Sequence, residues 1–389
     1  MTSSAPLWLF GDQLGPHFHS TPDHGHREVL LIESTRAAQR RRFHRQKLHL
    51  VLSGMRHLAE ELGERATYLR AESYRDALEE FGRPVLVFEP TSHAAERFVQ
   101  RLAEEGVVED VLPTPMFALG RADFAEWAGN RHQFRMETFY RDQRRRFEIL
   151  MNGDEPVDGR WNLDEENREP PPKKQARLGV DPPWWPTEDA IDEEVRTDLD
   201  ELDLDTVGKD GRRLFAVTAD EAQKALQHFV SYRLQDFGKY EDAVMTEDWT
   251  MSHSLLSVPL NLGLLAPLDV VEAAEKVWRD GDASLASVEG FVRQVLGWRE
   301  YVWHLYWHFG PEYADRNELG AHVPLPSWFT DLDGEKPIAA CMSHTLSELH
   351  DRGWVHHIPR LMILGNFALQ RGYDPKALME WFATAFVDG

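Results

Sequence analysis

Two adjacent histidines and an arginine stand where an apolar segment begins near the C-terminal end of the sequence. Residues 354–369 read WVHHIPRLMILGNFAL and contain His356, His357 and Arg360. Because proline is tolerated in the first turn of a helix, Pro359 predicts a helix that begins near His356 or His357. His357 and Arg360 then share one face of its N-terminal end, where unpaired N–H groups carry partial positive charge. This arrangement predicts a site for an anionic or electron-rich ligand with a proton donor in reach.

Two other interpretations of the paired histidines remain open at this point. Adjacent histidines can bind a metal, but no second carboxylate or thiol lies at ligand spacing, so we predict no metal site. The pair could also be a surface cap in solvent. Trp354, just before the pair, favours a partly buried neighbourhood instead.

A second candidate segment is HSLLS, at residues 253–257, which is followed by a helical pattern. Hydroxyl groups and free backbone N–H groups at the start of a helix suit a phosphate or pyrophosphate. The alternative is an ordinary serine N-cap without a ligand.

The sequence also contains 13 tryptophans. They cluster, and Trp298, Trp303, Trp307, Trp328, Trp354 and Trp381 all lie in the helical C-terminal half. Core packing explains a single tryptophan well. The set as a whole favours stacking of flat ligands or relay of an electron hole.

Charge and cysteine content limit the possible functions. The formal net charge of -23 argues against non-specific nucleic-acid binding. Arginines nevertheless cluster at 40–47 and at 141–146. One cysteine, Cys341, excludes an internal disulfide framework.

The chain of 389 residues is long enough for two domains. The first residues, MTSSAPLWLFGDQL, lack the basic and long apolar regions of a signal peptide. No window approaches 18 uncharged apolar residues, so we predict no transmembrane helix and no membrane contact. We therefore expect a cytoplasmic protein.

Residues 1–130 alternate short apolar runs with helical patterns. Strands are predicted at PLWLF (6–10), EVLLIES (28–34) and PVLVFEP (84–90), and helices at 44–64 and 92–106. This alternation predicts a parallel sheet covered by helices, with small ligands at the carboxyl ends of the strands. Residues 11–15, GDQLG, lie at one such end.

The rest of the chain differs in composition. Residues 131–211 predict an interdomain helix followed by an acidic, proline-rich linker, and 152–205 show little periodicity. Residues 212–389 are helical in pattern, with a capping box predicted at Thr218 and Glu221. The expected fold class is an N-terminal α/β domain with a Rossmann-like parallel sheet (1–130), joined through residues 131–211 to an all-α domain (212–389).

Seven segments, in this order, resemble the photolyase/cryptochrome family. They are LWLFGDQL at the N-terminus, RMETFYRDQRRRFEILM (135–151), GRWNLDEENR (159–168), FGKYEDAVM (237–245), HSLLSVPLNLGLL (253–265), EGFVRQVLGWREYVWHLYW (289–307) and HHIPRLMILGNFALQRG (356–372). The resemblance covers nearly the whole chain. It points to the bacterial and archaeal photolyase-related branch, whose described members are (6-4) photolyases with an iron–sulfur cluster. It implies a helical domain that binds folded-back FAD, and light-driven repair of UV-damaged DNA by a monomer.

The resemblance also implies a cofactor site. It assigns the diphosphate turn to Ser254, Leu255, Leu256 and Ser257, further FAD contacts to Tyr240, Gln294, Arg299 and Arg360, and the partner of Arg360 to Asp388. A lumazine-type antenna pigment is implied near Asp12, Gln13 and Glu33.

Catalytic roles follow from the same resemblance. Trp298 and Trp354 resemble the aromatic walls of a lesion pocket, and His356 and His357 resemble the histidines that contact a (6-4) lesion and pass a proton. Trp381 and Trp328 resemble members of the tryptophan chain that reduces the flavin in light.

The sequence departs from the family pattern at two points. Cys341 resembles the first of four cysteine ligands of the iron–sulfur cluster, but no other cysteine is present, so we expect no cluster. The sequence ends at FVDG (386–389), before the loop that covers the isoalloxazine ring in relatives, so we expect an open flavin site. A cryptochrome-like blue-light photoreceptor and a flavin-free, truncated remnant are the alternatives to a repair enzyme.

Overall fold

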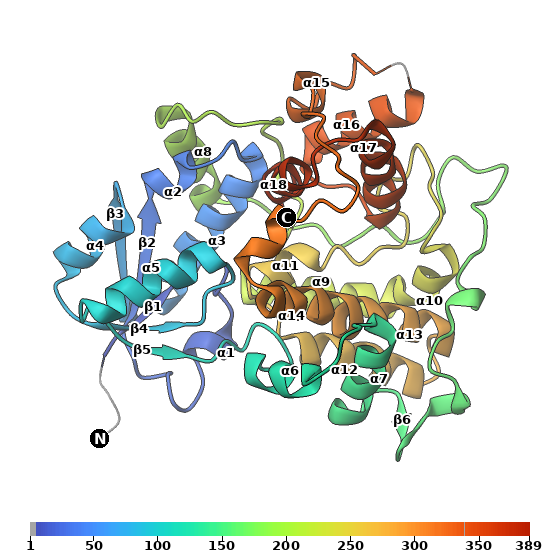
Figure 1. The fold of residues 1–389 in the computed structure, drawn as a ribbon, viewed down its shortest axis with the longest axis horizontal. Coiled ribbons are helices and arrows are strands. Elements are labelled where there is room, and N and C mark those ends of the chain that lie inside the picture. The colour runs from blue at the N-terminus through green and yellow to red at the C-terminus, as the bar shows by residue number, and fades with distance from the viewer. Residues whose placement is uncertain (1–4, 338) are drawn as a thin grey trace.

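Short apolar runs near the N-terminus form a parallel sheet in the computed structural model, which describes residues 5–337 and 339–389 (Figure 1). Its strands are β1 (Leu7–Leu9), β2 (Val29–Ser34), β3 (Ala66–Ala71), β4 (Val85–Phe88) and β5 (Val108–Leu112). The order across the sheet is β3-β2-β1-β4-β5, and Trp8 of β1 lies opposite Leu30 of β2 and Val87 of β4. Because neighbouring strands are parallel, their carboxyl ends lie at one edge of the sheet.

Helices cover both faces of the sheet. They are α1 (Pro16–His19), α2 (Thr35–Gln39), α3 (Arg45–Leu62), α4 (Tyr74–Phe81) and α5 (His93–Glu104). Alternate strand residues enter two apolar layers. Trp8, Leu30 and Val87 pack with residues of α4 and α5, whereas Leu7 and Leu31 pack with residues of α3. The predicted α/β class of the N-terminal part is therefore confirmed.

The chain after the sheet is mainly helical, as the sequence predicts. Its α-helices are α6 (Arg121–Ala128), α7 (Met136–Phe147), α8 (Ala190–Glu201), α9 (Ala219–Tyr232), α10 (Leu234–Phe237), α11 (Ser257–Asn261), α12 (Pro267–Arg279), α13 (Leu285–Val292), α14 (Glu300–Phe309), α15 (Ser327–Thr330), α16 (Ala340–Arg352), α17 (Asn366–Arg371) and α18 (Pro375–Ala385). A two-residue hairpin pairs β6 (Met151–Asn152) with β7 (Glu155–Pro156).

Tighter and wider helical turns complete the helical part. The short 3₁₀ turns are η1 (Gly63–Arg65), η2 (Val157–Gly159), η3 (Asp164–Glu166), η4 (Gly238–Tyr240) and η6 (Pro311–Asp315). Two π-helical segments, η5 (Arg293–Arg299) and η7 (Pro359–Gly365), lead into α14 and α17. Because π-helical turns are rare and concentrate at functional sites, these two segments mark where a site is expected.

The acidic segment that the sequence predicts as a linker without periodicity contains helix α8. The helix begins with a capping box formed by Asp189 and Asp192, and it packs against α3. Asp192 is fully buried and accepts hydrogen bonds from Ser53 Oγ at 2.7 Å and His49 Nε2 at 3.0 Å. The linker prediction is wrong for residues 190–201, because these charged contacts hold a helix that its acidic composition conceals.

Of the two hydrogen bonds in the capping box predicted at Thr218 and Glu221, only one forms. Thr218 Oγ1 accepts from the Glu221 N–H at 3.2 Å. The Glu221 carboxylate instead accepts from the Val217 N–H at 3.0 Å and pairs with Arg213 at 2.6 Å. The buried guanidinium of Arg213 requires a counter-charge, which takes the carboxylate away from the box.

One apolar core joins the sheet to the helical part. Leu9 and Leu50 from the α3 side of the sheet belong to the same buried cluster as Leu226 of α9 and Phe291 of α13. The sheet and the helical part therefore pack directly against each other and are not joined by a linker alone. No helix within the described residues is both long and apolar enough to cross a membrane.

Candidate functional site

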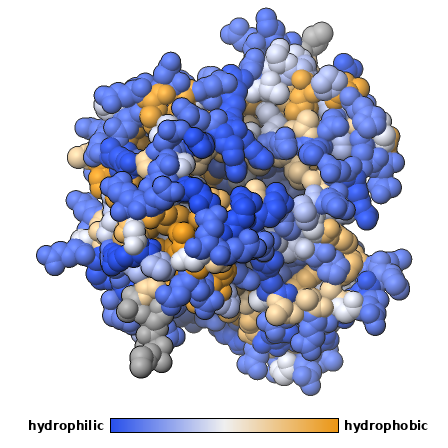
Figure 2. Space-filling model, turned by 60° about the vertical axis from the view of Figure 1, so that its left-hand side comes forward, coloured by the Kyte–Doolittle hydropathy of each residue, from blue (hydrophilic) through white to orange (hydrophobic). Residues whose placement is uncertain are grey.

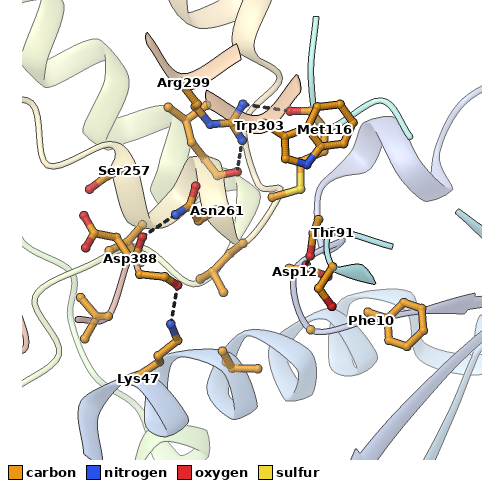
Figure 3. Close-up of a pocket in the computed structure, with 18 of the residues that line it drawn as sticks. Phe10, Asp12, Lys47, Thr91, Met116, Ser257, Asn261, Arg299, Trp303 and Asp388 are labelled. Atoms are coloured by element: carbon orange, nitrogen blue, oxygen red, sulfur yellow. Dashed lines mark hydrogen bonds between the residues drawn. The ribbon is translucent and has the colours of Figure 1, made fainter. Parts of the chain in front are cut away.

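A cavity of about 1770 Å³ lies between the carboxyl end of the sheet and the helical part. Small-molecule sites usually measure about 300–1,000 Å³, so this cavity has room for a large ligand or for two. Its walls come from the segment after β1, the segment after β4, the HSLLS turn, η5 and residues 354–360. Figure 3 shows Asp12 and Thr91 on the sheet side and Asp388 on the opposite side. Figure 2 shows apolar side chains recessed among polar ones on the face where the sheet comes forward.

The structure brings most of the predicted site residues to this cavity. Those that line it are Asp12, Ser254, Leu255, Leu256, Ser257, Gln294, Trp298, Arg299, Trp354, His357, Arg360 and Asp388. The remaining predicted residues, His356, Tyr240, Gln13, Glu33, Trp328 and Trp381, lie elsewhere in the described chain.

The two adjacent histidines point in different directions. The helix begins at His357, which lines the cavity and is exposed, whereas His356 is 3% exposed and stacks on the ring of His253 at 4.5 Å. Burial lowers the pKa of His356 to about 3. Burial and the charge of Arg360 also lower the pKa of His357, and the charge of Asp242 opposes this. Both rings are therefore mostly neutral at pH 7, and His357 is the one that can reach a ligand in the cavity.

Arg360 and Asp388 form an ion pair in the cavity wall. Arg360 Nη2 donates to Asp388 Oδ2 at 2.9 Å, and Trp354 Nε1 donates to the same oxygen at 3.1 Å. Arg360 is fixed by a second bond, from Nε to the Val355 carbonyl at 2.6 Å. Burial would raise the pKa of Asp388, but the charge and hydrogen bond of Arg360 outweigh burial, and the pKa is lowered. The carboxylate is therefore ionised and holds the guanidinium and the indole in place.

Ser254 and Ser257 of the HSLLS turn line the cavity. Ser254 Oγ accepts from the Leu256 N–H at 3.3 Å, and Ser257 Oγ accepts from Trp354 Nε1 at 3.4 Å. Leu255 between them has a φ of 59°, a left-handed conformation that costs a leucine about 1–3 kcal/mol. Buried Arg233 anchors the turn by donating from Nη2 to the His253 carbonyl at 3.1 Å. Helix α11, which follows, has five residues, so its dipole contributes little. The strained turn, rather than the helix start that the sequence suggests, orients the hydroxyl groups.

Two side chains fasten the C-terminal segment beside the cavity (Figure 3). Lys47 Nζ donates to the Ala383 carbonyl at 2.9 Å and to the Gly389 carbonyl at 2.6 Å. Asn261 Nδ2 donates to the Asp388 carbonyl at 2.7 Å. Burial lowers the pKa of Lys47 to about 8, against the opposing charge of Asp388. Lys47 is therefore mostly cationic at pH 7 and adds positive charge to this wall.

The π-helical segment η5 supplies Gln294, Trp298 and Arg299. Trp298 is 47% exposed, so its ring is available to stack on a flat ligand. Arg299 donates from Nη1 to the Met116 carbonyl at 3.1 Å and from Nη2 to the Leu260 carbonyl at 3.2 Å. These bonds make Arg299 a bridge between a loop after the sheet and α11, although it lines the cavity (Figure 3).

Three residues predicted to contact a cofactor or an antenna do not reach the cavity. Tyr240 packs in a separate small apolar cluster. Gln13 is fully buried, and its Oε1 accepts from the Phe10 N–H at 3.2 Å. Glu33 is occupied by Arg56, which donates from Nε at 2.7 Å. Sequence spacing does not indicate these internal partners.

Trp381 and Trp328 lie together in an apolar cluster beside the cavity. Trp381 is 6% exposed, and its ring lies 4.5 Å from that of Phe329. The Phe386 ring lies 5.8 Å from Trp381 and 4.4 Å from the Arg360 guanidinium. Aromatic contacts therefore extend from the cavity wall at Arg360 to Trp381.

Among the residues that line the cavity, Lys47, His253 and Glu241 received no individual role in the sequence prediction. Lys47 belongs to the basic cluster at 40–47, His253 is the first residue of the HSLLS segment, and Glu241 follows Tyr240. Their residue types gave a reason to consider them, but the contacts that matter join segments far apart in the chain.

One group among the described residues could hold a cation, formed by His57, Asp189 and Asp192 between α3 and α8. The ring nitrogens of His57 already contact the Ser53 carbonyl at 2.7 Å and Asp189 at 3.0 Å. These hydrogen bonds explain why the three residues lie together: they hold α8 against α3.

Comparison with known proteins gives agreeing results. The family model "Deoxyribodipyrimidine photo-lyase-related protein" matches residues 7–215. A (6-4) photolyase from Agrobacterium fabrum is 36% identical over 399 residues, which cover 98% of this chain and 77% of the relative. Among solved structures, a bacterial class III photolyase from Agrobacterium tumefaciens has a TM-score of 0.64 at 17% identity, covering 100% of this chain and 77% of that chain. A cryptochrome from Synechocystis has a TM-score of 0.65 at 12% identity, and 80% of its chain is covered. The similarity to these two solved structures concerns the fold alone.

Proposed function

The chain belongs to the deoxyribodipyrimidine photo-lyase-related family, and on this premise we propose that it uses FAD and light to repair UV-damaged DNA, with (6-4) pyrimidine photoproducts as its lesion. One observation carries the proposal. A single large cavity gathers the HSLLS turn, the Arg360–Asp388 pair, the exposed ring of Trp298 and the imidazole of His357. These are the kinds of groups that a dinucleotide and a damaged base require.

The residues present fit FAD, which photolyases generally bind. The hydroxyl groups of Ser254 and Ser257 suit the diphosphate, and strain at Leu255 is typical of a turn that a ligand stabilises. Lys47 and Arg360 supply positive charge within the same cavity. When bound and reduced, FAD supplies on excitation the electron that opens the bond between two fused pyrimidines.

The lesion side of the cavity is proposed to lie at Trp298 and His357. A damaged base must leave the duplex to enter, which costs least when the lesion is already unpaired. The exposed indole of Trp298 can stack on that base. His357, exposed at the cavity, is positioned to give a proton as bonds rearrange. Because its pKa is lowered, repair should become faster as the pH falls from 8 toward 6.

The neighbours of these groups have supporting roles in the proposal. His356 packs on His253 and keeps the backbone before His357 in place. Trp354 is buried and forms the wall behind Asp388. Trp381, with Trp328 in the same cluster, relays an electron toward the cavity along the aromatic contacts at Phe386.

Further cofactors and the state of the protein remain proposals of the same kind. Of the three antenna residues, Asp12 lines the cavity and supports a lumazine-type pigment, whereas Gln13 and Glu33 have internal partners. Four cysteine ligands cannot come from these 389 residues, which contain Cys341 alone, so iron analysis of the purified protein should give no cluster. We further propose a cytoplasmic monomer, which gel filtration and cell fractionation test.

The test is repair of an oligonucleotide that carries one (6-4) photoproduct, by protein loaded with FAD under blue light. Wild-type protein should restore the bases, and His357→Ala should lose at least about 90% of the rate, since general acid catalysis contributes about 10²–10⁴-fold. His350→Ala is the matched control, because the His350 side chain is exposed and pairs with Asp351. Wild-type protein that leaves the lesion unchanged in light refutes the proposal.

The same samples separate the alternatives. A blue-light photoreceptor should reduce its flavin in light and leave the lesion unrepaired. A flavin-free remnant should take up no FAD at all.

A further inference from the structure

Glu241 is a carboxyl group in the cavity wall to which the proposed mechanism gives no role. It directly follows η4 and lines the cavity with Gln294 of η5. Gln294 Nε2 donates to Glu241 Oε1 at 2.7 Å. The other carboxyl oxygen, Oε2, lies beside Gly290. A Cβ atom at position 290 would come within 3.3 Å of this oxygen, so the glycine leaves room for the carboxyl group. The hydrogen bond from Gln294 thus orients the carboxyl group, and Gly290 leaves space for it.

Burial, more than the surrounding charges, keeps Glu241 protonated at neutral pH. Burial is the main cause that raises its pKa to about 8; the charge of Arg293 opposes this rise, and the charges of Asp242, Asp164 and Glu289 add to it. Arg293 does not act as its partner, because its Nη2 donates to Asp164 at 3.0 Å and its Nε lies 3.6 Å from Glu289. His357 lines the same cavity, and the charge of Asp242 acts on its pKa against the effects of burial and Arg360.

A protonated Glu241 and its partner form an adjacent donor and acceptor. The Glu241 O–H can donate into the cavity. The amide nitrogen of Gln294 is bonded to Glu241 and to the Gly290 carbonyl at 3.3 Å, which leaves its Oε1 as an acceptor. A ligand that matches this pair presents a carbonyl oxygen beside an N–H group. The imide edge of a pyrimidinedione ring has this pattern.

We propose that Glu241 and Gln294 recognise the imide edge of a pyrimidinedione ring, with Glu241 donating to a ring carbonyl and Gln294 accepting from the ring N–H. Two ligands of the proposed function carry such an edge, a thymine of the lesion and the isoalloxazine ring of FAD. The inference rests on the proposed function, and its test distinguishes the two sources.

The test compares wild type, Glu241→Gln and Glu241→Leu in two binding titrations. One measures FAD uptake by flavin-free protein. The other measures, in the dark, the affinity of FAD-loaded protein for an oligonucleotide with one (6-4) photoproduct. Glu241→Gln keeps an acceptor for Gln294 and an N–H donor that does not ionise, whereas Glu241→Leu removes both. Glu247→Gln, at an exposed carboxyl nearby in the chain, is the control.

At pH 7 we expect Glu241→Leu to weaken one of the two affinities about tenfold, as loss of a buried hydrogen bond predicts, and Glu241→Gln to retain it. Loss confined to the oligonucleotide assigns the edge to the lesion, and loss confined to FAD assigns it to the flavin. Between pH 7 and pH 9 the affinity of wild type should fall about tenfold, because a carboxyl with a pKa of about 8 loses its proton there. Glu241→Gln contains the same histidines and should show no such fall.

Two results overturn the inference. One is unchanged affinity for both ligands in Glu241→Leu, with thermal melting showing a folded protein. The other is a wild-type pH profile that Glu241→Gln reproduces. Failure of the proposed function looks different, because wild type itself would then bind neither FAD nor the damaged strand.

Discussion

Replacing Asp388 with asparagine tests how strongly the cavity wall depends on its ion pair. The Asp388 side chain is 4% exposed and accepts from Arg360 at 2.9 Å and from Trp354 at 3.1 Å. Asparagine can keep the bond from Trp354 through its carbonyl oxygen, but it leaves the guanidinium without a counter-charge. Breaking a buried pair costs about 3–5 kcal/mol, and the 23% exposure of the Arg360 side chain reduces this to about 2–3 kcal/mol.

This cost translates into a measurable shift of melting temperature. An unfolding entropy of about 2.1 cal/mol/K per residue gives about 0.8 kcal/mol/K for a chain of 389 residues, so Asp388→Asn should melt about 3 °C lower. Urea unfolding of Asp388→Asn, Arg360→Met and the double variant should give a coupling energy of about 2 kcal/mol. Measurements on flavin-free protein remove any contribution from ligand binding.

The pH dependence of the coupling has a definite sign. The pKa of Asp388 is lowered below 3.8 in the folded protein, so its stabilisation is fully present above that value and is lost as the pH falls through the lower folded pKa. The coupling should therefore be the same at pH 6 and pH 8. A coupling below about 0.5 kcal/mol, or a variant as stable as wild type, refutes the account of this wall.

Three further predictions concern other parts of the structure. Asp192→Asn should lower the unfolding free energy by about 3 kcal/mol and speed hydrogen exchange in α8, since the fully buried carboxylate has His49 and Ser53 as donors; Glu193→Gln, at an exposed position, should change neither. Trp381→Phe should slow flavin photoreduction at least about tenfold without changing FAD content, and unchanged transient-absorption kinetics would remove Trp381 from the relay. Ser254→Ala should weaken FAD about tenfold in a fluorescence titration while leaving flavin-free melting within about 1 °C, and equal affinity would remove this hydroxyl from the cofactor site.

The sheet and its helices could be predicted because their local patterns agree with the final packing. Strands such as EVLLIES are buried on both faces and therefore read as continuous apolar runs. Helix α8 was missed although Ile191, Val195 and Leu199 recur at helical spacing. The high content of acidic residues in this segment is typical of a linker. In the structure, however, several of these acidic side chains pair with the basic and histidine side chains of α3.

The sequence predicts those parts of the site that lie within one short segment. It does not predict the contacts that join segments far apart in the chain. The HHIPR segment correctly predicts a helix that begins at its histidines. His356 and His357 nevertheless face different spaces, because His356 precedes the helix and stacks on His253, whereas His357 is the first helical residue and lines the cavity. Glu241 is oriented by Gln294, which lies 53 residues later in the chain. Lys47 reaches the C-terminal segment across more than 330 residues. Such contacts depend on the fold as a whole, and no spacing rule supplies them.

The central claim is that one cavity between the sheet and the helices holds FAD, and a visible absorption spectrum of the purified protein after incubation with FAD tests it most directly. We predict a yellow protein with one bound flavin per chain after gel filtration. A colourless protein that circular dichroism shows to be folded, and that takes up no FAD, would contradict the account.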